Sequence, residues 1–133
     1  MKTILASLLI FFLSACTDQS ETANKTIEPV NLVAQGKALF NQKHLGKDKV
    51  IGCVLCHSVE AGQVIIGPSL TGLSLRAAHL VKGETAEHYI RNAIINPDAY
   101  IVEGFTPAVM LSNFAEALSK DEIEALVAYL MTL

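Results

Sequence analysis

Apolar residues recur at helical spacing in several segments of the chain, and these segments predict its main elements. The first segment runs from Leu32 to Phe40 and predicts a helix of about ten residues. The second covers residues 86–95, where Thr85 can cap the helix and Pro97 would end it. No segment shows the strict alternation of apolar and polar residues that is typical of a half-buried strand.

The third helical segment has the clearest start signal. Ser119 is followed three positions later by Glu122, which is the spacing of a capping box. An apolar stripe follows, made of Ile123, Leu126, Val127 and Leu130. Residues 52–73 and 97–118 contain Gly and Pro between the helices and are predicted to form long loops. The fold class predicted is all-α.

Residues 1–15 have a pattern of their own. After a cationic start at Lys2, an apolar run covers residues 4–13, which is too short for a membrane-spanning helix. The run ends in Leu-Ser-Ala before Cys16, which resembles the processing box of bacterial lipoproteins. That resemblance implies a signal peptide over residues 1–15, a lipid on Cys16, and an exported protein anchored to a bacterial membrane, facing the periplasm or the cell exterior. The alternative is an ordinary signal peptide that happens to contain a cysteine.

Two further segments make up the exported part. Residues 16–31 hold the cysteine and a polar stretch without aromatic residues, which is typical of a flexible tether. Residues 32–133 contain the helical segments and predict a single domain. A domain of this size with few long helices buries little helix–helix surface, so loops wrapped around a large cofactor would supply the missing core.

The 133-residue chain has a formal net charge of −3, and its charges are unevenly spread. Residues 25–82 contain seven Lys and Arg against three Asp and Glu, whereas residues 83–133 contain two against eight. We therefore expect a molecular dipole that would steer docking to a charged partner protein. The acidic balance and the lack of a basic stripe with interleaved aromatic residues argue against nucleic-acid binding.

The three cysteines single out one chemical motif. Cys16 lies in the lipoprotein-like box, whereas Cys53 and Cys56 form Cys-x-x-Cys directly before His57. Cys-x-x-Cys-His is an attachment signature for haem c, in which two thiols reach two vinyl groups on one porphyrin edge and the histidine falls beneath the iron as a ligand. Two alternatives are a redox Cys-x-x-Cys, which would need a βαβ pattern, and a zinc site. The spare candidates for zinc ligands are His44, His79 and His88.

With this motif in place, the chain resembles the class I cytochromes c over essentially all of residues 32–133. The family's order is helix, Cys-x-x-Cys-His, Gly-Pro loop, helix, methionine loop and helix, and each part is present in that order. Gly67-Pro68-Ser69-Leu70 matches the family's Gly-Pro-x-Leu. The match implies that the Pro68 carbonyl accepts a hydrogen bond from His57 and so orients the imidazole. The resemblance also implies one covalently bound haem c with its iron.

The second iron ligand implied by the resemblance is Met110. It lies in the loop before the last helix, where the family keeps its distal methionine, whereas Met131 lies in the last turn of that helix. The family's Met-Pro is Met110-Leu111 here, a departure that would loosen the loop and weaken the iron–sulfur bond. His79 and His88 are the alternative ligands.

The resemblance extends to packing and to particular relatives. The family crosses its first and last helices at a small residue flanked by aromatic rings, and Gly36, Phe40 and Tyr129 fit these roles. Residues 89–105 and 121–133 look most like the cytochrome domain fused to subunit II of some haem–copper oxidases, without that subunit's membrane helices and copper motif. The chain is also similar to the small monohaem lipoprotein subunit of alternative complex III.

The function implied is one-electron transfer in a bacterial respiratory chain rather than catalysis. Ligation by histidine and methionine leaves no open iron position, so electrons would pass through an exposed haem edge. We expect a membrane-anchored carrier that passes electrons from a quinol-oxidising complex to a terminal oxidase or reductase. One alternative is a fixed cytochrome subunit of a larger respiratory complex. Another is a haem gas sensor that opens the iron by releasing Met110.

Overall fold

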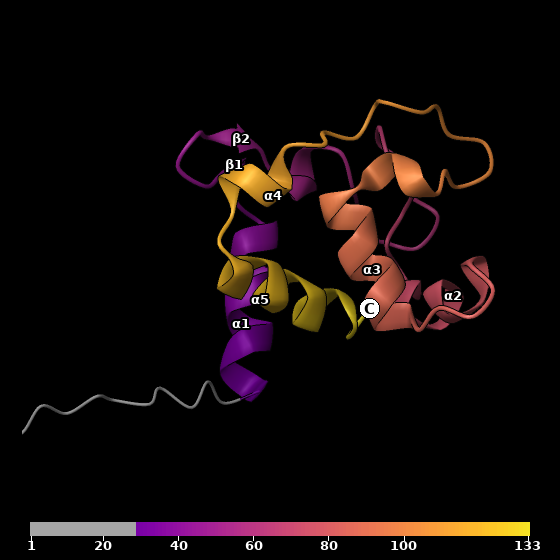
Figure 1. The fold of residues 1–133 in the computed structure, drawn as a ribbon, viewed down its shortest axis with the longest axis horizontal. Coiled ribbons are helices and arrows are strands. Elements are labelled where there is room, and N and C mark those ends of the chain that lie inside the picture. Colours follow the sequence, from indigo (N-terminus) through magenta and orange to yellow (C-terminus); the bar gives the residue numbers. More distant parts are fainter. Residues whose placement is uncertain (1–28) are drawn as a thin grey trace, which may run out of the picture.

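The structure is a computed structural model that describes residues 29–133 (Figure 1). Its elements in chain order are α1 (Pro29–Phe40), β1 (His44–Leu45), β2 (Val50–Ile51), η1 (Cys53–Leu55), α2 (Leu73–Leu80), α3 (Ala86–Ile95), η2 (Pro97–Ala99), α4 (Phe114–Ala117) and α5 (Lys120–Leu130), where η marks a 3₁₀ helix. This mainly helical composition confirms the predicted class. None of the helices described in this range is long and apolar enough to cross a membrane.

The first helix starts slightly earlier than the helix predicted from Leu32. α1 begins at Pro29, so residues 29–31 are helical, although the sequence predicts a tether up to Asn31. Proline suits the first helical position because the N–H group that it lacks would have no partner inside the helix there. The predicted signal peptide, Cys16 and the rest of the predicted tether lie outside the described residues.

The helix starts predicted after Thr85 and Ser119 are confirmed. The Thr85 hydroxyl accepts a hydrogen bond from the backbone N–H of His88 at 3.1 Å. The Ser119 hydroxyl accepts from the Glu122 N–H at 3.3 Å, while the Glu122 carboxylate accepts from the Ser119 N–H at 2.8 Å. These bonds satisfy N–H groups that a helix leaves without partners in its first turn. The local sequence therefore sets where α3 and α5 begin.

α1 and α5 pack against each other at Gly36, in the most extensive contact between two helices of the domain (Figure 1). A Cβ atom at Gly36 would lie 1.8 Å from the carbonyl oxygen of Ala125, so only glycine permits this approach. Beside it, the rings of Phe40 and Tyr129 have centroids 5.6 Å apart and planes inclined by 58°. The predicted roles of the glycine and the two aromatic residues in this crossing are confirmed.

Several short elements depart from the predicted long loops. η1, η2 and α4 lie within residues 52–73 and 97–118, and α4 is a single turn of four residues. β1 and β2 pair antiparallel, but strands of two residues cannot show an alternating pattern. α2 follows Gly72, whose φ of 65° is left-handed and which offers no side chain as a cap. These elements depend on packing rather than on local start signals.

The basic and acidic parts of the sequence meet in space. Lys47, in the turn between β1 and β2, lines one surface hollow together with Glu116 and Glu122. Arg91 pairs with Glu87 at 2.9 Å and also with Glu124. Near Lys47, basic and acidic side chains from different parts of the sequence therefore lie close together.

Candidate haem-binding site

Cys53, Cys56 and His57 are brought together by one 3₁₀ turn, η1. The backbone N–H groups of Cys56 and His57 both donate to the Cys53 carbonyl oxygen, at 3.1 and 2.8 Å. Both thiols are free and half-buried. Burial is the main cause that raises the pKa of Cys53 to about 11, so this thiol is neutral near pH 7.

The His57 imidazole is held in one orientation by the loop that follows it. Its Nδ1 donates a hydrogen bond to the Pro68 carbonyl oxygen at 2.9 Å, which is the bond that the Gly-Pro match implies. With the proton on Nδ1, the neutral ring presents the lone pair of Nε2. Burial lowers the pKa of His57, partly offset by the bond to Pro68, and so favours the neutral ring. The imidazole is therefore ready to act as a nitrogen donor to a metal.

Gly67 lies directly against the His57 ring. A Cβ atom at this position would be 2.4 Å from Cε1 and 2.9 Å from Nε2 of the imidazole. Any side chain would therefore push the ring and the backbone apart. The Gly67 N–H also donates to the Cys56 carbonyl oxygen at 2.9 Å, which ties the loop to the haem motif. Gly67 thus admits the ring, and Pro68 orients it.

Two residues outside the predicted site brace the loop after the Gly-Pro pair. Arg76 on α2 donates to the carbonyl oxygen of Ser69 at 2.9 Å and to that of Thr71. Thr71 Oγ1 donates to the Val59 carbonyl oxygen at 2.6 Å, which joins the loop to the segment after the haem motif. These partners are backbone carbonyls five to twelve positions away, so no sequence motif marks them.

Met110 lies in the loop between η2 and α4, which swings out from η2 and returns towards α4 (Figure 1). Its side chain is half-buried and packs against the hydrophobic core. Met131, by contrast, is 37 % exposed at the end of α5. Of the alternative ligands, His79 is exposed on α2, and His88 is exposed on α3, 3.1 Å from Glu84. Among these candidates Met110 is the side chain that packs on the core.

Apolar side chains are exposed on both loops that would wall a haem crevice. Ile65 and Ile66, in the loop after the haem motif, are 48 and 55 % exposed. Val109, beside Met110, is 50 % exposed. Exposed apolar side chains of this size, gathered near a site, are the kind that a ligand or a partner protein covers.

The rivals of the haem interpretation find no support in the described part of the chain. Within residues 29–133, no three His, Cys, Asp or Glu side chains gather so as to hold a metal ion, so the zinc alternative lacks ligands. The strands described there are two residues long and antiparallel, so the βαβ unit of a thioredoxin-like redox motif is absent from this range. The donor set consists of two free thiols, a neutral imidazole and a thioether on the core, and it fits a covalently attached haem.

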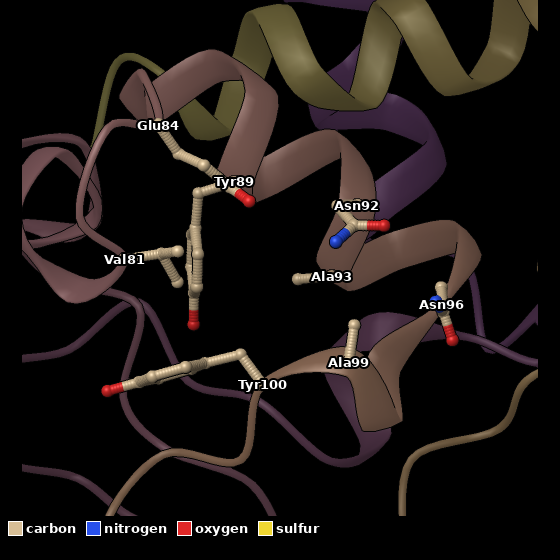
Figure 2. Close-up of a pocket in the computed structure, with 8 residues that line it drawn as sticks. All are labelled: Val81, Glu84, Tyr89, Asn92, Ala93, Asn96, Ala99 and Tyr100. Carbon is tan, nitrogen blue, oxygen red and sulfur yellow. The ribbon is translucent and has the colours of Figure 1, made fainter.

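A cavity of about 170 Å³ lies between α3 and the segment from η2 to Tyr100 (Figure 2). Tyr89 and Tyr100 form one side of it, with ring centroids 5.7 Å apart, while Asn92 and Asn96 line the other. Burial is the largest of the causes that raise the pKa of Tyr89. The cavity is smaller than the ~300–1,000 Å³ of most small-molecule sites, and none of the predicted haem residues lines it. By itself it does not mark the haem site.

Comparisons with known proteins identify the family of the chain. Residues 33–133 match the family model for cytochrome c. Cytochrome c2 iso-1 of Magnetospirillum fulvum is 34 % identical over 92 residues, which cover 60 % of this chain and 89 % of that protein. Cytochrome c2 iso-2 of Magnetospirillum molischianum is 30 % identical over 87 residues, which cover 61 % of this chain and 90 % of that protein. The chain therefore belongs to the cytochrome c family.

Membership of this family establishes the fold, the cofactor and the general activity. The chain is a class I monohaem cytochrome c with one covalently attached haem c and its iron, and residues 53–57 fit the attachment motif. It is an electron-transfer protein rather than an enzyme. The haem supplies an iron that can gain and lose one electron. The polypeptide binds and orients this group and limits the access of water to it.

Proposed function

We propose that the protein is a membrane-anchored electron carrier of a bacterial respiratory chain. It would take electrons from a quinol-oxidising complex and pass them to a terminal oxidase or reductase. The observation that carries this proposal is the combination, in one chain, of a cytochrome c domain and a lipoprotein-like start that ends in Cys16. Export would place the domain outside the cytoplasm. A lipid on Cys16, followed by a polar segment, would keep it within reach of membrane complexes.

In this proposal Cys53 and Cys56 attach the haem, and His57 and Met110 bind its iron. The neutral His57 ring, oriented by Pro68, and the position of Met110 on the core support these roles. With His57 and Met110 both bound to it, the iron would have no place for a substrate, so the site would exchange electrons only. A thioether ligand also raises the reduction potential relative to a second imidazole.

Docking to the donor and the acceptor would use the exposed apolar side chains of the two loops. Ile65, Ile66 and Val109 are each about half exposed. The two isoleucines directly precede Gly67 and Pro68, and Val109 directly precedes Met110. Small contacts of this kind suit partners that must exchange quickly, while charged groups around them guide the approach.

Optical spectroscopy of the ferric holoprotein tests the ligand assignment. We expect the weak sulfur-to-iron charge-transfer band in the wild type and its loss in Met110→Ala. Met131→Ala is the matched control and should keep the band, because Met131 is exposed at the end of α5. A wild type without the band, or a Met110→Ala protein that retains it, would contradict the assignment. Tight binding of carbon monoxide to the reduced wild type would favour the gas-sensor alternative instead.

Fractionation of cells that produce the full chain tests the anchor. Wild-type protein should stay with the membranes after a high-salt wash, and mass spectrometry should find a lipid on Cys16. Cys16→Ser should release holoprotein with an unchanged absorption spectrum. Membrane retention of a Cys16→Ser protein from which residues 1–15 have been removed would contradict the lipid anchor. Co-purification with a respiratory complex after detergent extraction would favour the fixed subunit over the free carrier.

A further inference from the structure

We propose that Asp98 positions the Met110 loop, in place of the proline that the family commonly has after its distal methionine. The role is that of a positioning residue, because Asp98 would act through the backbone of the loop and not on the iron. This inference rests on the proposed function, since it requires that Met110 binds the iron.

Ala108 has an unusual backbone conformation two residues before Met110. Its φ of 59° lies in the left-handed region, which a residue with a Cβ atom rarely adopts. Its N–H donates a hydrogen bond to Asp98 Oδ1 at 2.8 Å. A bond to a carboxylate is stronger than one to a neutral acceptor, so this bond offsets the cost of the conformation. The Asp98 side chain therefore holds the turn from which the chain continues to Met110.

Asp98 is well placed to serve as a fixed point. It lies in η2 between Pro97, which is buried, and Ala99, whose N–H donates to the Asn96 carbonyl oxygen at 3.0 Å. The fixed φ of proline and this bond restrict the backbone on both sides of Asp98. η2 directly follows α3, which packs against α2 and α5. The carboxylate thus links the loop to the packed helices.

The rest of the loop has few bonds of its own. Among the described residues, segment 101–112 contains one internal backbone hydrogen bond, which the Phe105 N–H donates to the Val102 carbonyl oxygen at 3.0 Å. Residues 106–109 are all exposed. Leu111 stands where the family has a proline, so φ after the methionine is not restricted by a ring. Among the described residues, the bond to Asp98 is therefore the hydrogen bond that ties residues 106–109 to a neighbouring element of the fold.

Competition by imidazole on the ferric holoprotein tests this role. Imidazole can bind the iron only where Met110 has left it, so its apparent affinity reports the fraction of open loop. Asp98→Ala should raise that affinity roughly three- to tenfold, because one hydrogen bond then no longer favours the closed loop. Asp98→Asn keeps an acceptor oxygen without the charge, so its imidazole affinity should lie between those of the wild type and Asp98→Ala. Glu103→Ala removes a carboxylate of the same loop that bonds to no described residue, and it should change nothing.

The outcomes separate this role from the proposed ligand and from general instability. A wild type without the charge-transfer band overturns both the ligand and the role of Asp98. A wild type with the band, together with an Asp98→Ala protein that binds imidazole as the wild type does, overturns only the role of Asp98. Equal changes in Asp98→Ala and Glu103→Ala would show an effect of charge, which also overturns it. Guanidinium unfolding of each variant separates a change in overall stability from a change in the loop. An Asp98→Asn protein that binds imidazole as tightly as Asp98→Ala would exclude positioning by this hydrogen bond.

Discussion

The two sides of the proposed haem site are held in different ways. On the side of His57, backbone hydrogen bonds join neighbouring parts of the loop, and the N–H groups of Ile66 and Gly67 both donate to the Cys56 carbonyl oxygen, at 3.1 and 2.9 Å. The ring itself lies on Gly67 and is bonded to Pro68. An imidazole surrounded in this way has little freedom to turn.

The side of Met110 is held by fewer bonds. The loop over residues 101–112 is mostly exposed, and within the described residues its link to a neighbouring element is the bond from Ala108 to Asp98. The thioether is therefore positioned mainly by packing, whereas the imidazole is positioned by hydrogen bonds and steric fit. We expect changes on the His57 side to act on assembly and stability, and changes on the Met110 side to act on ligation of the iron.

The largest effect is expected from Gly67→Ala. The new Cβ would lie 2.4 Å from the His57 Cε1, so the ring and the backbone must separate. Overpacking of this kind should lower the free energy of unfolding by about 1–3 kcal/mol and reduce the haem content of the purified protein. Guanidinium unfolding and the ratio of haem to protein measure the two changes.

Gly36→Ala is the matched control for this clash. Its Cβ would meet the Ala125 carbonyl oxygen at 1.8 Å, but at the crossing of α1 and α5 rather than at the imidazole. It should destabilise the fold at least as much, because the clash is with backbone, and leave the absorption spectrum of the bound haem unchanged. Identical spectra for the two variants would show that Gly67 does not position the His57 ring.

A smaller effect is expected from Thr71→Val, which removes the hydrogen bond to the Val59 carbonyl and nearly keeps the shape of the side chain. The loss should lower the free energy of unfolding by about 1 kcal/mol, because a half-buried acceptor loses its partner. The charge-transfer band and the imidazole affinity should not change. Thr106→Val in the Met110 loop is the control, since Thr106 is exposed and bonds to no described residue. A higher imidazole affinity in Thr71→Val would mean that the two sides are not independent.

The smallest effect is expected from Leu111→Pro, which restores the residue common in the family. The Leu111 N–H donates to no described residue, so the change removes no such bond, and the ring restricts the backbone after Met110. Restriction of the open loop should favour ligation by about 0.4–1 kcal/mol and lower the imidazole affinity roughly two- to fivefold. Leu111→Ala changes the side chain without this restriction and should lack the effect. Tighter imidazole binding in Leu111→Pro would show that the loop does not accept a proline here.

The sequence predicts an element well when the signal for it lies next to the groups on which it acts, and poorly when the element depends on residues far away in the chain. α3 and α5 are predicted because Thr85 and Ser119 stand next to the N–H groups that they cap. α2 and the strands β1 and β2 lack such signals, and the sequence does not predict them. α4 follows Asn113, a residue type common at helix starts, but the Asn113 side chain makes no capping bond. The crossing of α1 and α5 at Gly36 is predicted through the family resemblance, since periodicity shows an apolar face but not its partner.

The sequence by itself determined the all-α class, the starts of α3 and α5, and the haem-attachment motif. It could do so because caps and the Cys-x-x-Cys-His motif place their groups within five successive residues, where the geometry of the chain brings them together. The bond from His57 to Pro68, eleven positions away, is predicted only through the family resemblance. Only the tertiary structure decided the bond between Asp98 and Ala108, which are ten positions apart, and the bonds by which Arg76 and Thr71 brace the loop after Pro68. Such contacts join loops whose approach depends on the packing of the whole domain, and the residues next to each group do not encode that packing.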